Sequence, residues 1–187
     1  MNSFFDKKEI DALGFKSVGD NVMLSRKASI YGASNIEIGN NVRIDDFCIL
    51  SGKITLKSNI HIAAYSALYG SDVGIYIENF ANISSRVCIY AISDDYTGET
   101  MTNPTIPDKY KNLEKAPVTI GNHVIVGTGS TILPGVDLKI GTAVGAMSLV
   151  KKSTEPWKIY AGIPAKPIKE RTRNLLELER CYLEDEN

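Results

Sequence analysis

Cysteine and histidine are scarce in this chain, which leaves little material for disulfide bonds or metal sites. The 187 residues include three cysteines, Cys48, Cys88 and Cys181, and their scattered positions form neither a disulfide framework nor a zinc-binding cluster. The two histidines, His61 and His123, lie far apart in the sequence. We therefore predict reduced thiols and no bound metal ion.

The chain also lacks an excess of one charge and a long apolar run. Its 21 basic and 22 acidic residues leave a net charge of -1, so no surplus of positive charge is available to follow the phosphates of a nucleic acid. No apolar segment approaches the roughly 18 residues that span a bilayer, and the N-terminal MNSFFDKKEI lacks the pattern of a signal peptide. These features predict a cytoplasmic protein with a single core.

What the sequence does contain is a repeat with a period of six residues. Aliphatic residues recur at this spacing, with two interruptions, at Ile38, Ile44, Leu50, Leu56, Ile62, Leu68, Ile77, Ile83, Ile89, Ile120, Val126, Ile132, Leu138, Val144 and Val150. A second column of small or β-branched residues lies two positions earlier, from Ile36 to Ser148. Because residues two apart on a strand point the same way, each hexad predicts a short strand with two inward side chains, followed by a turn.

Three such hexads make one coil of eighteen residues, and stacked coils predict a three-sided parallel β-helix. We expect about five coils between residues 18 and 150. A β-sandwich with accidental spacing is the alternative. Residues 1–17 are expected to form a helical cap, with Ser3 and Asp6 near its start. Residues 151–187 are expected to form a tail and an amphipathic helix that covers the end of the solenoid.

Residues 91–117 interrupt the repeat with a polar, proline-containing segment. A loop of this length in a compact solenoid is usually functional, although a disordered insertion is the alternative. It contains the pair Asp94 and Asp95, followed by Tyr96. Together with Tyr69 and Tyr90, these residues are candidates for a polar pocket with aromatic rings that stack on a sugar.

The hexads, the segment IGNHVIVGTGSTILPGVDLKIGTAVGAMSLV (120–150) and the following AGIPAKPI (161–168) resemble the hexapeptide-repeat acyltransferases. The likeness is to the galactoside and maltose O-acetyltransferase branch and to related enzymes of bacterial polysaccharide synthesis. It covers residues 18 to 170. The resemblance implies an all-β, left-handed parallel β-helix with an excursion loop, a homotrimer with active sites between subunits, acetyl-CoA as cosubstrate and a sugar acceptor.

The resemblance also implies a set of CoA-binding positions. These are Ile125, Thr128, Ala146, Lys151, Lys152, Ala165 and Lys166. Small residues around Gly127 and Gly145 are expected to leave backbone N–H groups open to a thioester, and the three lysines supply positive charge for phosphates. A solvated basic turn is the alternative for the lysines. Ile125 stands where many relatives have tryptophan.

The general base is where this sequence departs from the family pattern. In the galactoside branch a histidine at the start of the excursion loop deprotonates the acceptor hydroxyl, but here that stretch reads Ile-Ser-Asp-Asp-Tyr (92–96). His61 points outward between two inward residues and is one candidate base, with Asp94 of a neighbouring chain fixing its tautomer. His123, in a corner that we expect to face solvent, is a weaker candidate. If the acceptor is an amine, Asp94 or Asp95 suffices.

The sequence therefore predicts an acetyl-CoA-dependent O-acetyltransferase that acts on a sugar hydroxyl by direct transfer. The alternative within enzymes is N-acetylation of a nucleotide-linked amino sugar. A carbonic anhydrase on the same scaffold needs three zinc-binding histidines, and the chain has two. A purely structural β-helix needs neither the long loop nor the basic segment that ends the repeat.

Overall fold

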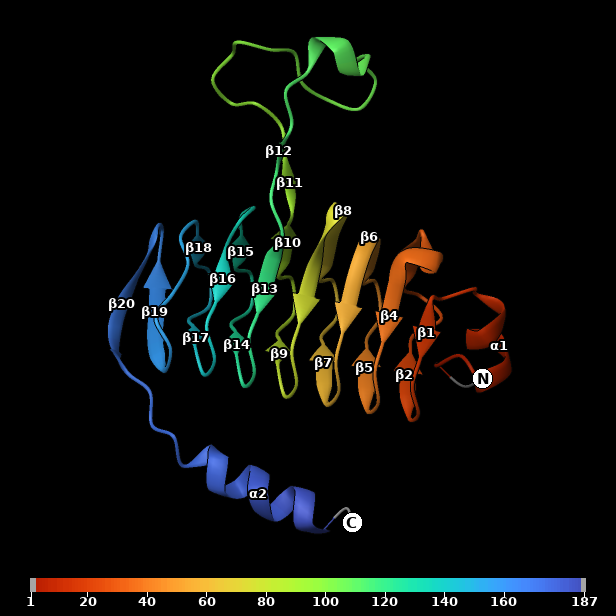
Figure 1. The fold of residues 1–187 in the computed structure, drawn as a ribbon, viewed down its shortest axis with the longest axis vertical. Helices are drawn as coiled ribbons and strands as arrows, with labels where there is room; N and C mark the ends of the chain where they lie inside the picture. Colours follow the sequence, from red (N-terminus) through yellow and green to blue (C-terminus); the bar gives the residue numbers. More distant parts are fainter. Residues whose placement is uncertain (1–2, 186–187) are drawn as a thin grey trace.

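A computed structural model describes residues 3–185 and shows a prism of stacked coils, as the hexads predict (Figure 1). Each short strand pairs in parallel with the strand one coil away, so the strands form three faces that run the length of the prism. We number the faces one to three and name each corner by the two faces that it joins. The three-sided parallel β-helix is confirmed.

Strands on the first face pair residue for residue; Leu50 lies beside Leu68, and Leu68 beside Ile89. This face consists of β3 (Ser29–Tyr31), the first parts of β6 (Ile49–Leu56) and β8 (Ala67–Ile77), β10 (Cys88–Tyr90), β15 (Thr131–Ile132) and β18 (Leu149–Val150). The second face consists of β1 (Ser17–Val18), β4 (Ile36–Ile38), the second parts of β6 and β8, β13 (Val118–Ile120) and β16 (Asp137–Leu138). Because β6 and β8 bend around the 1–2 corner, the two faces form one ten-stranded sheet.

The third face is longer than the repeat predicted. It consists of β2 (Val22–Leu24), β5 (Val42–Ile44), β7 (Ile60–Ile62), β9 (Asn82–Ile83), β14 (Ile125–Val126), β17 (Ala143–Val144) and β19 (Lys158–Gly162), and β20 (Ala165–Glu170) adds an antiparallel edge. Within the described residues this face has seven parallel strands, more than the five coils expected, because pairing starts before the regular hexads and continues past residue 150.

The core of the prism is the two hexad columns. Every residue of both columns is buried, which confirms the inward direction that the period assigned to them. Hydroxyl groups in the second column are satisfied by backbone carbonyls: Ser66 Oγ donates to Ser84 O at 2.9 Å, and Ser148 Oγ donates to Gly145 O at 2.7 Å. Burial of aliphatic side chains along the whole axis is the main source of stability in such a fold.

Asparagine forms a ladder at the 2–3 corner. Asn21, Asn41 and Asn59 adopt positive φ values of 54°, 54° and 59°, a conformation that asparagine tolerates better than most residues. Their side-chain amides also bond along the corner, from Asn21 Nδ2 to Asn41 Oδ1 at 2.8 Å and from Asn41 Nδ2 to Asn59 Oδ1 at 3.2 Å. One residue type therefore satisfies both the backbone turn and the contact between coils.

A short helix, α1 (Lys7–Ala12), lies at the N-terminal end of the prism. Asp6 caps it: the Asp6 carboxylate accepts a hydrogen bond from the Glu9 N–H, and the Glu9 carboxylate accepts one from the Asp6 N–H. Ile10 is buried against the first coils. The helix therefore covers the apolar end of the core.

The C-terminal helix does not cover the other end of the solenoid, contrary to the expectation. The helix α2 (Leu175–Asp185) turns back and lies along the 2–3 corner, below the prism in Figure 1. The Tyr182 ring meets Phe80 edge to face at 6.1 Å, and Glu179 bonds to His123. The hairpin of β19 and β20 lies at the C-terminal end instead.

The excursion loop leaves the prism at the 1–2 corner and stands away from it, on the side opposite the third face (Figure 1). Its two ends pair as antiparallel strands β11 (Ile92–Ser93) and β12 (Glu114–Lys115), and its outer part contains a 3-10 turn, η2 (Asp108–Tyr110). A second 3-10 turn, η1 (Ala33–Asn35), lies earlier in the chain, just before β4. No helix among residues 3–185 is long and apolar enough to cross a membrane.

Candidate functional site

Two clefts flank the root of the excursion loop and share Ser93. The larger, about 650 Å³, lies against the first face and is lined by Tyr69, Tyr90, Asp94, Asn103 and Lys111, among others. The smaller, about 480 Å³, lies toward the C-terminal coils and is lined by Tyr96, Glu114, Leu133, Pro134 and Lys151. We call them the Asp94 cleft and the Lys151 cleft. The loop thus separates a hollow with two tyrosines, Asp94 and Lys111 from one with Glu114 and the exposed Lys151.

Asp94 combines a fixed position with a free carboxylate oxygen. Its Oδ1 accepts a long hydrogen bond of 3.3 Å from the N–H of Asn103, across the loop. The backbone on which it lies is anchored by β11, whose partner strand carries Lys115, and the Lys115 ammonium pairs with Asp72 of β8 at 2.9 Å. A carboxylate held in a cleft by one hydrogen bond keeps lone pairs available for a substrate proton.

Asp95 has a different role in the structure from its neighbour. Its carboxylate accepts four hydrogen bonds, from the N–H and Oγ1 of Thr97 at 2.7 and 2.6 Å and from those of Thr100 at 3.0 and 2.8 Å. The Thr97 bonds, followed by those of Thr100, lower the pKa of Asp95 to about 2. Such a carboxylate organises the loop and is a poor proton acceptor at neutral pH.

Two tyrosines form the wall of the Asp94 cleft. The rings of Tyr69 and Tyr90, on neighbouring coils, stack with centroids 5.0 Å apart and an interplanar angle of 17°. Burial raises the pKa of Tyr90, so its hydroxyl stays protonated as a hydrogen-bond donor. The third predicted ring, Tyr96, lines the other cleft and is 92% exposed. Aromatic faces beside a carboxylate suit a polar ring such as a sugar.

His61 is paired with a carboxylate that the sequence reasoning passed over. Its Nε2 lies 2.8 Å from Asp45 Oδ2 on the outer side of the third face, and Arg43 Nε donates to the other oxygen of Asp45 at 2.7 Å. Burial acts to raise the pKa of Asp45, but the bonds from His61 and Arg43 outweigh it, so the pKa lies below its usual value. Asp94 lies beyond the 1–2 corner, and His61 lies on the third face, which is on the other side of the prism. A single chain therefore does not bring Asp94 and His61 together.

His123 is buried, contrary to the expectation of a solvent-facing corner. Its side chain is 8% exposed, its ring stacks on Phe80 at 5.2 Å, and its Nε2 lies 2.9 Å from Glu179 of α2. Arg171 Nη1 donates to the His123 carbonyl at 2.7 Å. These contacts make His123 the anchor of the C-terminal helix and leave it no access to the Asp94 cleft.

The seven positions predicted for CoA lie on the last coils but on different sides of the prism. Thr128 and Ala146 are exposed at the 3–1 corner, Lys151 and Lys152 are exposed just past the first face, and Ala165 and Lys166 begin β20. Ile125 lines a cavity of about 330 Å³ beside α2. One chain therefore does not gather all seven around one hollow.

The glycines beside Thr128 and Ala146 are required by packing between coils rather than by open space. A Cβ on Gly127 would lie 2.5 Å from the backbone nitrogen of Ala146, and the Gly127 N–H donates to Val144 O at 2.8 Å. The Gly145 N–H is likewise engaged, with Tyr160 O at 2.8 Å. The N–H groups of Gly127 and Gly145 themselves therefore join neighbouring coils and are not open to a ligand.

Comparison with known proteins gives consistent relatives. A dTDP-4-amino-4,6-dideoxy-D-glucose acyltransferase from Escherichia coli is 50% identical over 183 residues, which cover 96% of this chain and 95% of the relative. A galactoside O-acetyltransferase from Escherichia coli strain K12 is 32% identical over 118 residues, 54% of this chain and 56% of the relative. No protein-family model matches the chain.

Among solved structures, AntD, an N-acyltransferase from Bacillus cereus, is 54% identical and superposes with a TM-score of 0.98 over 100% of both chains, in a complex with dTDP and 3-hydroxybutyryl-CoA. Another AntD structure is the S84A variant with dTDP-4-amino-4,6-dideoxyglucose and coenzyme A, and a third is the D94A variant. Identity of this degree over the full length, on the same solenoid, shows that the chain belongs to the hexapeptide-repeat β-helix acyltransferases.

Proposed function

We propose that this protein transfers an acyl group from acyl-CoA to the amine of a dTDP-linked 4-amino-4,6-dideoxy sugar. The observation that carries the proposal is the Asp94 cleft, which presents a carboxylate and stacked tyrosines and has no histidine. The full-length relatives support it, since both the Escherichia coli enzyme and AntD are described by a dTDP amino sugar. The amine acceptor thus replaces the hydroxyl acceptor that the sequence favoured.

Asp94 is the proposed proton acceptor. A neutral amine is already nucleophilic, so it needs a group that orients it and takes its proton, whereas a hydroxyl needs a stronger positioned base. The nitrogen lone pair attacks the thioester carbonyl and forms the C–N bond, and Asp94 takes the proton from the nitrogen. The C–S bond then breaks, and Asp94 gives this proton to the departing sulfur, which leaves as the CoA thiol. The products are the amide and free CoA.

Ser84 is a second proposed site residue, one that the sequence reasoning missed. It follows β9 at the 3–1 corner, where its N–H donates to Val126 O at 3.0 Å and its carbonyl accepts from Ser66. AntD has been studied as variants of both Ser84 and Asp94 in its own numbering, and this chain has the same residues under those numbers. The 54% identity and the TM-score of 0.98 over both full chains support giving Ser84 and Asp94 a role in the proposed site.

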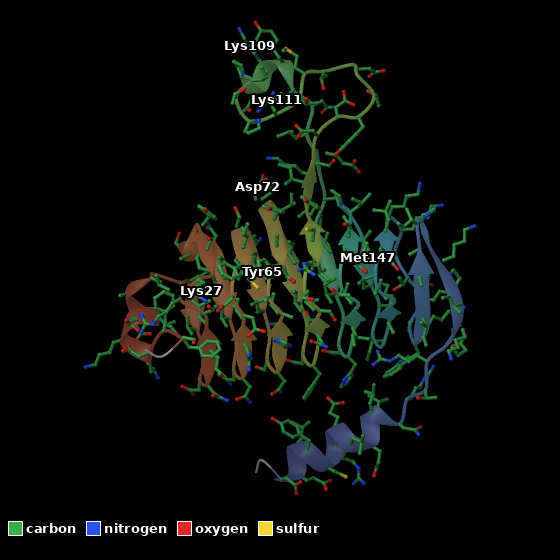
Figure 2. The ribbon with its side chains drawn as sticks, turned by 180° about the vertical axis from the view of Figure 1, so that it is seen from behind. Lys27, Tyr65, Asp72, Lys109, Lys111 and Met147 are labelled. Carbon is green, nitrogen blue, oxygen red and sulfur yellow. The ribbon has the colours of Figure 1, made fainter. Side chains whose placement is uncertain are left out.

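Ser84 and Asp94 lie at different corners of one prism, so a shared site requires two subunits. We propose a homotrimer, in which the loop of one subunit reaches the 3–1 corner of the next. That corner exposes Phe47, Tyr65 and Met147 at 46%, 55% and 66%, and Tyr65 and Met147 follow one edge of the prism in Figure 2. A sedimentation mass three times 20.5 kDa is expected, and a monomer contradicts the proposal.

The acyl-CoA donor is proposed to bind near the C-terminal end of the 3–1 corner. Thr128 and Ala146 lie there one coil apart, with Thr128 Oγ1 held by Ser85 O at 2.7 Å. Acyl-CoA is the proposed cosubstrate, and Ile125, Thr128, Ala146, Lys151, Lys152, Ala165 and Lys166 remain its proposed contacts. Lysines 151 and 152 lie near the loop root, where positive charge suits phosphate groups.

The acceptor class is tested with a matched pair of substrates. Purified protein is incubated with acetyl-CoA or 3-hydroxybutyryl-CoA and either dTDP-4-amino-4,6-dideoxyglucose or dTDP-6-deoxyglucose, which carries a hydroxyl at the same carbon. We expect amide formation, measured by mass spectrometry, to be at least about 100-fold faster than ester formation, because Asp94 is a weak base for a hydroxyl. Faster acylation of the hydroxyl sugar would restore the O-acetyltransferase prediction.

His61 is the alternative base, and its replacement separates the two candidates. With Asp94 as the base, His61→Gln should leave kcat within about threefold of the wild-type value, since only transition-state contacts change kcat strongly. If His61 takes the proton, kcat falls by about 100-fold or more. Asp45→Asn is the matched variant, because it removes the carboxylate that orients the ring.

A further inference from the structure

The side chain of Lys111 is largely covered, although most residues in the outer part of the excursion loop are exposed. Its side chain is 8% exposed, and its ammonium pairs at 3.0 Å with Asp108, whose side chain is 95% exposed. A carboxylate in full contact with water compensates a desolvated ammonium only weakly. The loop therefore withdraws a positive charge from solvent and leaves it with a weak partner.

The same lysine lines the cleft that contains Asp94. Lys111 and Asp94 both line the hollow of about 650 Å³, and Asn103, whose N–H bonds to Asp94, lines it as well. In the part of the chain that the structure describes, the two charges pair with other groups and not with each other. The cleft thus offers one negative and one positive group at separate points.

We propose that Lys111 binds the diphosphate of the nucleotide-linked acceptor and so determines its specificity. This inference rests on the proposed function, in which Asp94 faces the amine of the same molecule. A nucleotide-linked amino sugar carries the amine at one end of the pyranose ring and two phosphates beyond the other. Asp94 and Lys111 match this order of charges, and an ammonium is a common ligand of phosphate oxygens.

Lys109 supplies a matched control two residues away. It belongs to the same loop (Figure 2), and its exposed side chain lies over the Tyr110 ring at 4.8 Å, outside the lining of the Asp94 cleft. Lys109→Met removes the same charge from the loop as Lys111→Met, so any general electrostatic effect is common to both variants. Lys111→Arg keeps a cation for phosphate at the buried position.

The test is calorimetric titration of each variant with dTDP alone and with CoA alone, followed by kinetics with the amino sugar. We expect Lys111→Met to weaken dTDP binding by about 10- to 100-fold, the range for a lost hydrogen bond to a charged group, and to raise KM while kcat changes by less than about threefold. Lys109→Met should bind dTDP like the wild type, Lys111→Arg should keep most of the affinity, and CoA binding should be unchanged in all three.

Two results would overturn the inference. The Lys111→Met variant could bind dTDP as tightly as the wild type does, or it could lose affinity for CoA and not for dTDP. Thermal unfolding of each variant shows whether the loop change has disturbed the fold, and restored binding in Lys111→Arg excludes that explanation. Failure of the proposed function is seen separately, as wild-type protein that binds dTDP but does not acylate the amino sugar.

Discussion

Asp94→Asn should lower kcat for acyl transfer by about 100- to 10,000-fold, the usual contribution of a positioned general base. The amide has the shape of the carboxylate and can keep the contact with the Asn103 N–H, which bonds to Oδ1. It cannot accept a proton from the attacking amine. The measurement is steady-state turnover of the dTDP amino sugar at saturating acyl-CoA.

Glu99→Gln is the matched control for this variant, because Glu99 is an exposed carboxylate of the same loop. Its turnover should stay within about threefold of the wild-type value. Binding of dTDP should be unchanged in Asp94→Asn. This ligand lacks the amine that Asp94 is proposed to contact, and its diphosphate is proposed to bind Lys111. A fully active Asp94→Asn variant would show that another group takes the proton.

Leu68→Ala should lower the free energy of unfolding by about 2–5 kcal/mol, the range for removing a large buried aliphatic side chain. Leu68 is fully buried on the first face, between Leu50 of one neighbouring coil and Ile89 of the other. The cavity therefore weakens two contacts between coils at once. Guanidinium unfolding followed by circular dichroism, at one fixed protein concentration, measures the change.

Leu178→Ala provides the comparison on an exposed leucine. Leu178 lies on α2 and is 70% exposed, so its truncation should change the free energy of unfolding by less than about 0.5 kcal/mol. Equal losses in the two variants would mean that the hexad column does not carry the stability of the prism. A larger loss in Leu178→Ala would mean that α2 is packed more tightly than its exposure indicates.

The period of the sequence carried most of the information about the fold. Side-chain direction alternates along a strand, so the residues of both hexad columns could be placed in the core before any contact was known. The eighteen-residue length of one coil also predicts which residues of neighbouring coils lie side by side. It places Arg43 beside His61, and Asp45 follows two positions later on the same outer side, which makes the His61–Asp45 pair predictable.

Several errors depend on segments that lie outside the repeat. An amphipathic stripe shows that one side of residues 175–185 is covered, but it does not say which surface covers it, so α2 was assigned to the wrong place. The burial of His123 depends on that helix and could not be predicted without it. The different roles of Asp94 and Asp95 depend on how Thr97, Thr100 and Asn103 fold back within the loop.

Local periodicity thus sufficed for the prism, its buried columns and the position of the excursion loop, because each strand repeats the same inward pattern as its neighbours. The direction of α2, the burial of Lys111 and the two clefts at the loop root required the folded structure. These features arise from contacts between residues far apart in the chain, which no repeat encodes, and they are the features on which the proposed chemistry depends.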